Sequence, residues 1–269
     1  MAATSPDLAT PGLAERAAWA VRDTMTLTRR ELLLWLRVPA YIMFTVVQPV
    51  MFVLMFRYVF GGAIPVKVRG GYVSYLMPGI IGQTAAFASF TTAIALARQS
   101  QLGVIDRFRA MPMARGAVLG GRLCADAVRM MITILVIVGV GYAVGFRFQN
   151  GLAGAIGMVL LAEAFGLAIC CVSGAIGLAI RDEESVQAFG LIWLFPLTFV
   201  SSAFVPVQTM PGALRAFANH QPVTFVIDAM RALALGGPLE PHLWQAIVSI
   251  VGIFVVFGPL AVRIYKRRD

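Results

Sequence analysis

The chain has 269 residues, of which 59% are hydrophobic and 13% are charged, and it carries a net charge of +9. Because soluble domains carry about 25% charged residues, this composition and a mean hydropathy of +0.82 exclude an ordinary soluble globular protein. The positive charge does not indicate nucleic-acid binding, since the basic residues lie at the ends of apolar runs, where they set membrane orientation. The sequence therefore predicts an all-α membrane protein.

The segment before the first apolar run has two parts. Residues 1–12 are small and polar and contain prolines, which is typical of a flexible terminus and not of a signal peptide. Residues 13–38 are expected to form an amphipathic helix that lies in the membrane interface, with its arginines near anionic headgroups. The alternative is a cytoplasmic helix that packs on a partner. The two faces of this helix carry Val21, Met25, Leu32, Trp35 and Leu36 on one side and Arg22, Thr26, Arg29, Arg30 and Arg37 on the other.

Residues 39–264 are expected to form one domain with six transmembrane helices. Each of six stretches is long and apolar enough to cross about 30 Å of hydrocarbon. Lysines and arginines concentrate before the first span, in the connection after the second span and in the basic tail 265–269, which places both termini in the cytoplasm. The expected spans are roughly 40–60, 76–96, 125–144, 152–180, 188–204 and 243–264.

The most informative polar segment is the cytoplasmic connection 97–122. Residues 100–110 are expected to form a short helix that ends before Pro112. Such a helix either docks into a groove of another protein or lies on the membrane end of its own chain. Its apolar face would hold Val104, Ile105 and Phe108, and its charged face Asp106, Arg107 and Arg109.

The outer connection 205–242 is too long for a simple turn and too apolar for a disordered loop. Residues 213–219 and 224–235 are expected to form two short helices, neither of which is long enough to span. We therefore expect re-entrant half-membrane helices packed within protein at the outer leaflet, because non-helical backbone at that depth must be shielded from lipid.

The sequence contains no recognisable catalytic or nucleotide-binding motif. Its only lysines, Lys67 and Lys266, do not belong to a G-x-x-x-x-G-K-[ST] sequence, so the chain cannot supply its own P-loop for ATP. The spacing of His220 and His242 resembles no metal site. We therefore expect no enzymatic activity and no cofactor or metal bound by this chain.

Two acidic residues lie within apolar runs. Glu163 lies inside the fourth span, where an unpaired charge is costly, and such residues are functional candidates. The alternative is a neutral carboxyl that is bonded across helices or faces a polar cleft. Asp126 lies one helical turn from both Arg122 and Arg129, which predicts a structural ion-pair cluster at the start of the third span.

At two places the sequence resembles the daunorubicin-resistance group of ABC-2 type permeases, which are drug and lipid exporters. The cytoplasmic resemblance rests on Gly103, Asp106, Arg107, Met111-Pro112, Arg115 and Gly121-Arg122. The outer resemblance rests on F-V-P-V-Q-T-M-P-G-A-L, H-Q-P-V-T and A-M-R-A-L-A-L-G-G, which include Phe204, Pro206, Met210, Pro211, Pro222 and Arg231. Relatives usually carry an acid a few residues before Gly103, where this chain has Gln99, Ser100 and Gln101. Asp106 and the arginines must then carry more of the polar contact.

The resemblance implies a permease similar to type V exporters, with the segment 97–122 acting as the cytoplasmic coupling helix. Its ATPase-coupling residues would be Ser100, Gly103, Val104, Ile105, Asp106, Arg107, Phe108, Arg109, Pro112 and Arg115. The implied partners are two copies of a separate ABC ATPase that binds ATP and Mg, and a second permease subunit that is identical or paralogous.

The function implied is outward movement of a hydrophobic or amphiphilic drug or lipid across a bacterial plasma (inner) membrane. The first, second and fifth spans would line the pathway. Two alternatives come from other classes of protein. One is a proton-coupled secondary transporter that uses Glu163, and the other, which the sequence favours less, is a membrane-embedded enzyme or a scaffold.

Overall fold

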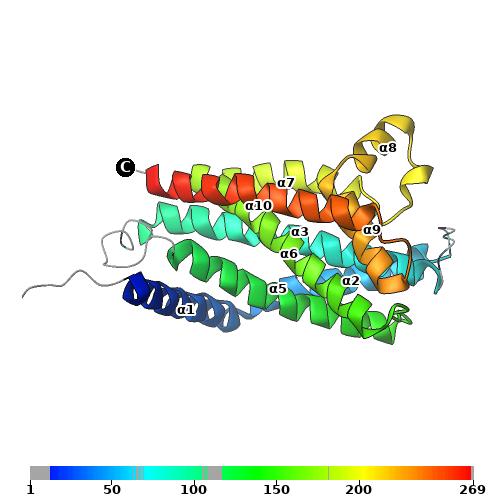
Figure 1. Ribbon diagram of the computed structural model, residues 1–269, viewed down its shortest axis with the longest axis horizontal. Helices are drawn as coiled ribbons and strands as arrows, with labels where there is room; N and C mark the ends of the chain where they lie inside the picture. Colours follow the sequence, from blue (N-terminus) through cyan, green and yellow to red (C-terminus); the bar gives the residue numbers. More distant parts are fainter. Residues whose placement is uncertain are drawn as a thin grey trace, which may run out of the picture.

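The computed structural model describes residues 13–62, 64, 66, 68, 70–104, 107, 117–180 and 182–267, and in these residues it contains helices and no strand. The long helices run side by side as a bundle (Figure 1). A π-helical turn, Phe56–Phe60, extends α2. The helices are α1 (Leu13–Arg37), α2 (Pro39–Met55), α3 (Gly71–Gln101), α5 (Ala117–Ala143), α6 (Gly151–Ala179), α7 (Glu183–Phe199), α8 (Gly212–Asn219), α9 (Pro222–Leu235) and α10 (His242–Arg267).

Four of these helices are long and apolar enough to cross a membrane. They cover Gly71–Gln101, Val118–Ala143, Gly151–Ala179 and His242–Tyr265, and they correspond to the second, third, fourth and sixth expected spans. The first expected span is a shorter apolar helix, Thr45–Phe60, and the fifth is α7, which has 17 residues and contains Pro196. The chain is thus a multi-pass membrane protein with four span candidates, and α2 and α7 run beside them (Figure 1).

Helices α3 and α6 cross very closely at the centre of the bundle. The hydroxyl groups of Ser89 and Ser173 form a hydrogen bond of 2.9 Å between them. One turn further, a methyl group at Gly177 would overlap the backbone of Ala93. Small residues at such spacings let helix backbones approach in a membrane, where van der Waals contact and hydrogen bonds drive association. The small side chains of Ser173 and Gly177 therefore pack α6 against α3 within one bundle.

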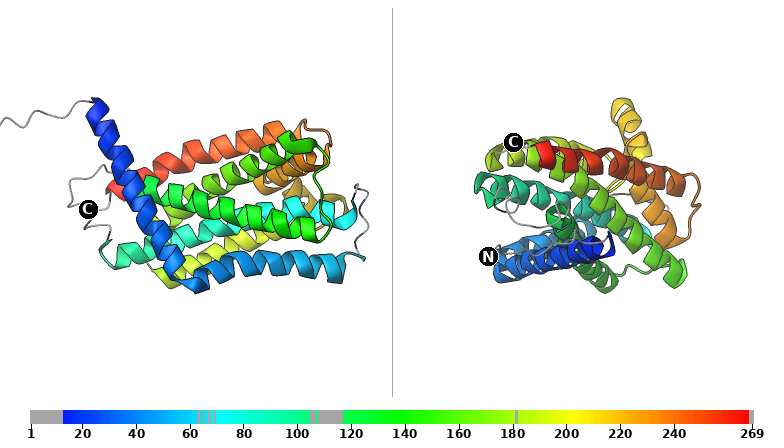
Figure 2. Two further views of the ribbon diagram at one scale, coloured as in Figure 1. Left: turned by 90° about the horizontal axis from the view of Figure 1, so that it is seen from below. Right: turned by 60° about the vertical axis from the view of Figure 1, so that its left-hand side comes forward.

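The two ends of the bundle differ. Helix α1 lies across one end at a steep angle to the other helices, and α10 ends at the same end of the bundle (Figure 2). Helices α8 and α9 lie at the opposite end (Figure 1). We call the first the inner end and the second the outer end, following the expected orientation. Helix α9 is largely buried, as expected, whereas α8 differs from that expectation because only Ala218 of its residues is buried.

We expect Gly177→Ala to lower the free energy of unfolding by about 1–3 kcal/mol, because the added methyl group would force α3 and α6 apart. Thermal unfolding of the detergent-solubilised chain, followed by tryptophan fluorescence, measures this difference. Gly139→Ala is the matched control, because a methyl group at Gly139 of α5 meets no atom within 4 Å. Equal losses of stability in the two variants would contradict the close crossing.

Candidate transport cleft and the polar clusters beside it

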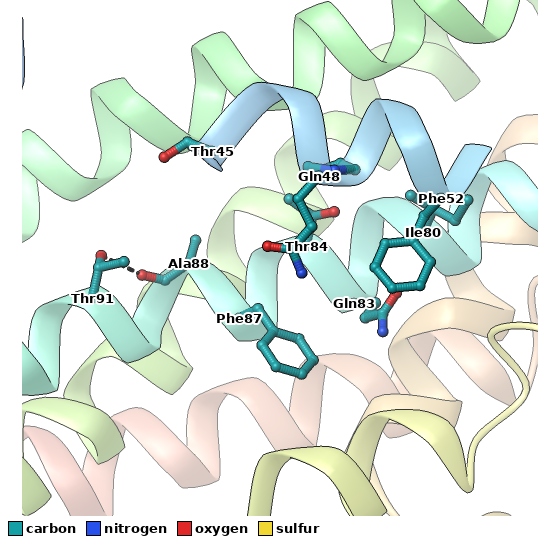
Figure 3. A pocket seen from close by; sticks show the side chains of 10 residues that line it. Thr45, Gln48, Phe52, Ile80, Gln83, Thr84, Phe87, Ala88 and Thr91 are labelled. Carbon is teal, nitrogen blue, oxygen red and sulfur yellow. Dashed lines mark hydrogen bonds between the residues drawn. The ribbon is translucent and has the colours of Figure 1, made fainter. Parts of the chain in front are cut away.

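A cleft of about 130 Å³ lies between α2 and α3 (Figure 3). Apolar and polar side chains share its wall, and none of the described side chains that line it is charged. Gln48 extends from α2 toward Thr84 on α3 (Figure 3). The lining residues are Thr45, Gln48, Pro49 and Phe52 of α2 and Ile80, Gln83, Thr84, Phe87, Ala88 and Thr91 of α3. The cleft is therefore an amphipathic site between the first two expected spans.

Three polar side chains in this wall have no hydrogen-bond partner within the described part of the chain: Gln48, Gln83 and Thr84. Gln83 is the most buried of the three, because only 5% of its surface is exposed. Its amide atoms reach the surface of the cleft, where a partner from outside the chain can bond them. Side chains of this kind favour a ligand that supplies donors and acceptors, and they were missed in the sequence because the average hydropathy of the second span conceals them.

An outer aromatic cluster, formed by Phe52, Phe56, Phe199 and Phe204, adjoins the cleft through Phe52. The ring centroids of Phe56 and Phe204 lie 4.5 Å apart in a stacked arrangement, and those of Phe199 and Phe204 lie 5.2 Å apart. Phe204 was predicted as a site residue of the outer segment, and the structure places it against both α2 and α7. The cluster lies between the cleft and the outer end of the bundle.

The loop 200–206 is held on α3 by an outer anchor of polar side chains. The Tyr72 hydroxyl donates to the carbonyl of Phe204 at 3.1 Å, and the Tyr75 hydroxyl donates to that of Ser202 at 2.9 Å. Arg231 donates to the same Ser202 carbonyl at 2.7 Å, and its guanidinium carbon lies 3.8 Å from the centre of the Tyr75 ring. Asp228 accepts from Arg231 at 2.5 Å. These contacts satisfy non-helical backbone that would be costly in lipid.

The remaining predicted residues of the outer segment have local roles in shaping the chain. Pro206 precedes the short 3₁₀ turn Val207–Thr209, and Met210, which follows that turn, is buried. Pro211 precedes α8, and Pro222 is the first residue of α9, where a missing N–H costs nothing. Of the predicted outer residues, Phe204 and Arg231 are thus brought to the same loop, while the prolines set where helices begin.

An inner polar cluster joins α1, α3 and α5. Asp126 accepts from Arg122 at 3.2 Å and from Thr92 at 2.6 Å, and it also forms an ion pair with Arg129. Arg122 in turn pairs with Glu31 of α1 at 2.8 Å. Asp126 and Arg122 are buried, so each charge is compensated by opposite charge and hydrogen bonds. The predicted cluster of Arg122, Asp126 and Arg129 is confirmed, and the structure adds Glu31 and Thr92.

The predicted coupling residues lie only partly within the described residues. Ser100 belongs to the last turn of α3 and does not begin a separate helix, because α3 continues to Gln101. The chain then turns at Gly103, whose φ of +64° favours glycine, and the Arg107 N–H donates to the Gly103 carbonyl at 3.2 Å. Val104 is half-buried and Arg107 is exposed. Ile105, Asp106, Phe108, Arg109, Pro112 and Arg115 lie outside the described residues.

Beside this turn, Asp182 caps the start of α7. It accepts from the backbone N–H of Ser185 at 2.6 Å and from Gln101 at the end of α3 at 3.5 Å. Hydrogen bonds from Ser185 lower the pKa of the Asp182 carboxyl below its ordinary value. The inner ends of α3 and α7 are thus tied together next to the coupling segment.

Glu163 lies in α6 and is 9% exposed. Neither of its carboxyl oxygens has a hydrogen-bond partner within the described part of the chain. It is not among the residues that line the α2–α3 cleft. The structure therefore does not bring this candidate to the cleft or to either polar cluster.

The sequence matches the family model described as ABC-2 type transporter over residues 22–235. A daunorubicin resistance ABC transporter permease protein of Streptomyces coeruleorubidus is 31% identical and covers 94% of this chain and 89% of its own length. A probable doxorubicin resistance ABC transporter permease protein of Mycobacterium tuberculosis is also 31% identical, with coverage of 96% and 93%. A putative transport permease of Pyropia yezoensis is 24% identical, with coverage of 77% and 72%. The family match includes the cleft, both polar clusters and the loop 200–206.

We expect Asp126→Asn to destabilise the chain by about 3–5 kcal/mol, because it removes the carboxylate shared by the buried Arg122 and the half-buried Arg129. Unfolding in mixed micelles with increasing denaturing detergent measures the change. Asp182→Asn is the control, since Asn caps helices as well as Asp does and this side chain is exposed. A stable Asp126→Asn variant would show that the inner polar cluster does not hold α1, α3 and α5 together.

Proposed function

Because the chain belongs to the ABC-2 type transporter family, we propose that it is the permease subunit of an ABC exporter. It moves a hydrophobic or amphiphilic molecule, a drug or a lipid, outward across a bacterial plasma membrane, with both of its termini in the cytoplasm. The proposal includes six spans, with α2 and α7 as the first and fifth. The observation that carries the transport pathway is the cleft between α2 and α3.

The chemistry of the cleft supports an amphiphilic cargo. Phe52 and Phe87 offer apolar contact, while Gln48, Gln83 and Thr84 offer donors and acceptors that have no partner in the described chain. The described part of the lining contains no ionisable side chain, so recognition there relies on neutral hydrogen bonds and apolar contact. A molecule with a large apolar body and hydroxyl, carbonyl or amide groups along one edge fits this wall.

The cleft is small, and this favours a pathway completed by a second permease subunit. Its volume of about 130 Å³ is below the usual size of about 300–1,000 Å³ for small-molecule sites. Large apolar side chains are exposed on α2, which lines the cleft, and on α7, whose Phe195 contacts Phe87 of the cleft wall. They include Met43, Val47 and Met51 of α2 and Phe189, Ile192 and Phe195 of α7. A second subunit, identical or paralogous, would cover these side chains and enlarge the site.

Energy for transport comes from a partner. The chain lacks a P-loop, so ATP and Mg bind to a separate ABC ATPase, present in two copies. We assign contact with the ATPase to the segment 97–122, which begins in the last turns of α3 at the inner end and extends into the start of α5. Motion of the ATPases would then reach α3 directly, since Ser100 and Gln101 are part of that helix.

We expect Gln83→Leu to raise the KM for export roughly twofold to tenfold, since the loss of one neutral hydrogen bond weakens binding by about 0.5–1.5 kcal/mol. The measurement is ATP-driven export of daunorubicin, and in parallel of a fluorescent phospholipid, from vesicles that hold the permease and its ATPase. Gln245→Leu on α10 is the matched control, because Gln245 lies outside the cleft. Unchanged KM for every exported probe would remove Gln83 from the pathway.

We expect the double variant Asp106→Asn, Arg107→Gln to uncouple export from ATP hydrolysis while membrane insertion stays intact. The two side chains are the central charged groups of the proposed docking helix. ATPase activity and export are measured in the same vesicles, with Arg57→Gln at the outer end as the charge control. Full ATP-driven export by the double variant would contradict the docking assignment. Export that survives ATP depletion and stops with the proton gradient would instead support the alternative that uses Glu163.

A further inference from the structure

Helix α1 presents a basic stripe on the side that faces away from α5. Thr26, Arg29, Arg30, Leu33 and Arg37 follow one another at steps of one, three or four residues, which keeps them on one face of a helix. The opposite face, with Leu27 and Trp35, is buried. With Leu34, the stripe lines a concave region of about 320 Å³. This surface is outside the cleft and both polar clusters.

The positive charge of the stripe is only partly neutralised. Arg30 pairs with Glu31 at 3.0 Å, and Glu31 is also held by Arg122 of the inner polar cluster. Arg29 and Arg37 have no partner within the described residues, and both are exposed. Two uncompensated guanidinium groups, each able to donate five hydrogen bonds, form a surface suited to phosphate oxygens.

Apolar side chains adjoin the arginines on the same helix. Met25 is 69% exposed and Leu36 is 56% exposed, and Leu33 and Leu34 lie within the concave region itself. Exposed apolar side chains beside a basic stripe are typical of a helix that lies flat in the membrane interface. The steep crossing of α1 over the inner end of the bundle places its axis close to the plane of such an interface (Figure 2).

We propose that this surface of α1 is a binding site for anionic phospholipids of the inner leaflet. Headgroup phosphates bind at Arg29 and Arg37, with Arg30 beside them, and the glycerol and upper acyl chains lie on Leu33 and Leu34. Leu33 and Leu34 favour a lipid over free phosphate, because an inorganic ion makes no favourable contact with apolar side chains. The exposed Met25 and Leu36 favour a lipid surface over an acidic protein, since a bilayer takes up apolar and basic side chains together.

The site has a direct connection to the interior through neighbouring residues. Glu31, which accepts from Arg30, also accepts from Gln99 of α3 and Arg122 of α5. When a phosphate binds Arg30 and breaks its ion pair with Glu31, Glu31 keeps its bonds with Gln99 and Arg122. These two bonds hold α1 against the bundle. Anionic lipid therefore acts on the inner ends of α3 and α5. This inference requires only that the chain resides in a membrane, so it stands or fails separately from the proposed export function.

The test is native mass spectrometry of the full chain in detergent, titrated with phosphatidylglycerol and with phosphatidylcholine of the same acyl chains. We expect tighter binding of phosphatidylglycerol, and in the double variant Arg29→Gln, Arg37→Gln a preference reduced roughly tenfold to thirtyfold, since each arginine near an anionic surface contributes a few-fold or more. The control is Arg57→Gln, Arg215→Gln, which removes equal charge at the outer end and should keep the preference. A single symmetric peak in size-exclusion chromatography shows that each variant is folded.

Three results would overturn the proposal. The first is equal binding of the two lipids by the unaltered chain. The second is full displacement of phosphatidylglycerol by excess inorganic phosphate, which would indicate a site for a free anion. The third is a double variant that keeps its lipid preference, and if that variant also loses ATP-driven export, the surface belongs to a protein partner.

Discussion

Close backbone contact with α3 is the constraint on which the rest of the bundle depends. Helix α6 touches it where Gly177 meets Ala93, and the loop 200–206 touches it where Gly79 meets the backbone of Ala203. Gly190 of α7 lies against the ring of Phe90. Each contact exists because a glycine removes the Cβ that would otherwise separate the two segments. Helix α3 thus cannot shift without moving α6, α7 and the outer loop.

Charge is distributed along α3 in a way that follows from the cost of placing ions in hydrocarbon. The inner polar cluster meets α3 at Thr92, and the outer anchor meets it at Tyr75. Between these two positions the cleft is lined by neutral side chains such as Gln83 and Thr84. The middle of the helix thus keeps hydrogen-bonding capacity without charge, which suits the proposed function of binding an amphiphilic molecule and then releasing it.

The sequence alone was enough to predict the features that depend only on residues close together in the chain. The apolar runs, the amphipathic α1, the two short outer helices and the Asp126 ion pairs all follow from spacing within one helix or from proline and glycine at its ends. Contact between Glu31 and Arg122 could not be predicted, because it depends on the angle at which α1 crosses α5. The start of the short helix expected at residues 100–110 was placed too early, since α3 continues as a regular helix to Gln101 and the chain turns only at Gly103.

The relative strengths of these contacts indicate where the protein can open. Removing one partner from a buried ion pair costs about 3–5 kcal/mol, so α1, α3 and α5 are expected to move as one body around Asp126. An aromatic pair such as Phe56 and Phe204 is worth only about 0.5–1.5 kcal/mol beyond its buried area. Helix α2 also contains Pro49, which removes one backbone hydrogen bond, and it continues into a π-helical turn. A push on the inner end of α3 would therefore separate the outer aromatic cluster first. The cleft would widen toward the outside while the charged inner end stays closed, which is the order that outward export requires.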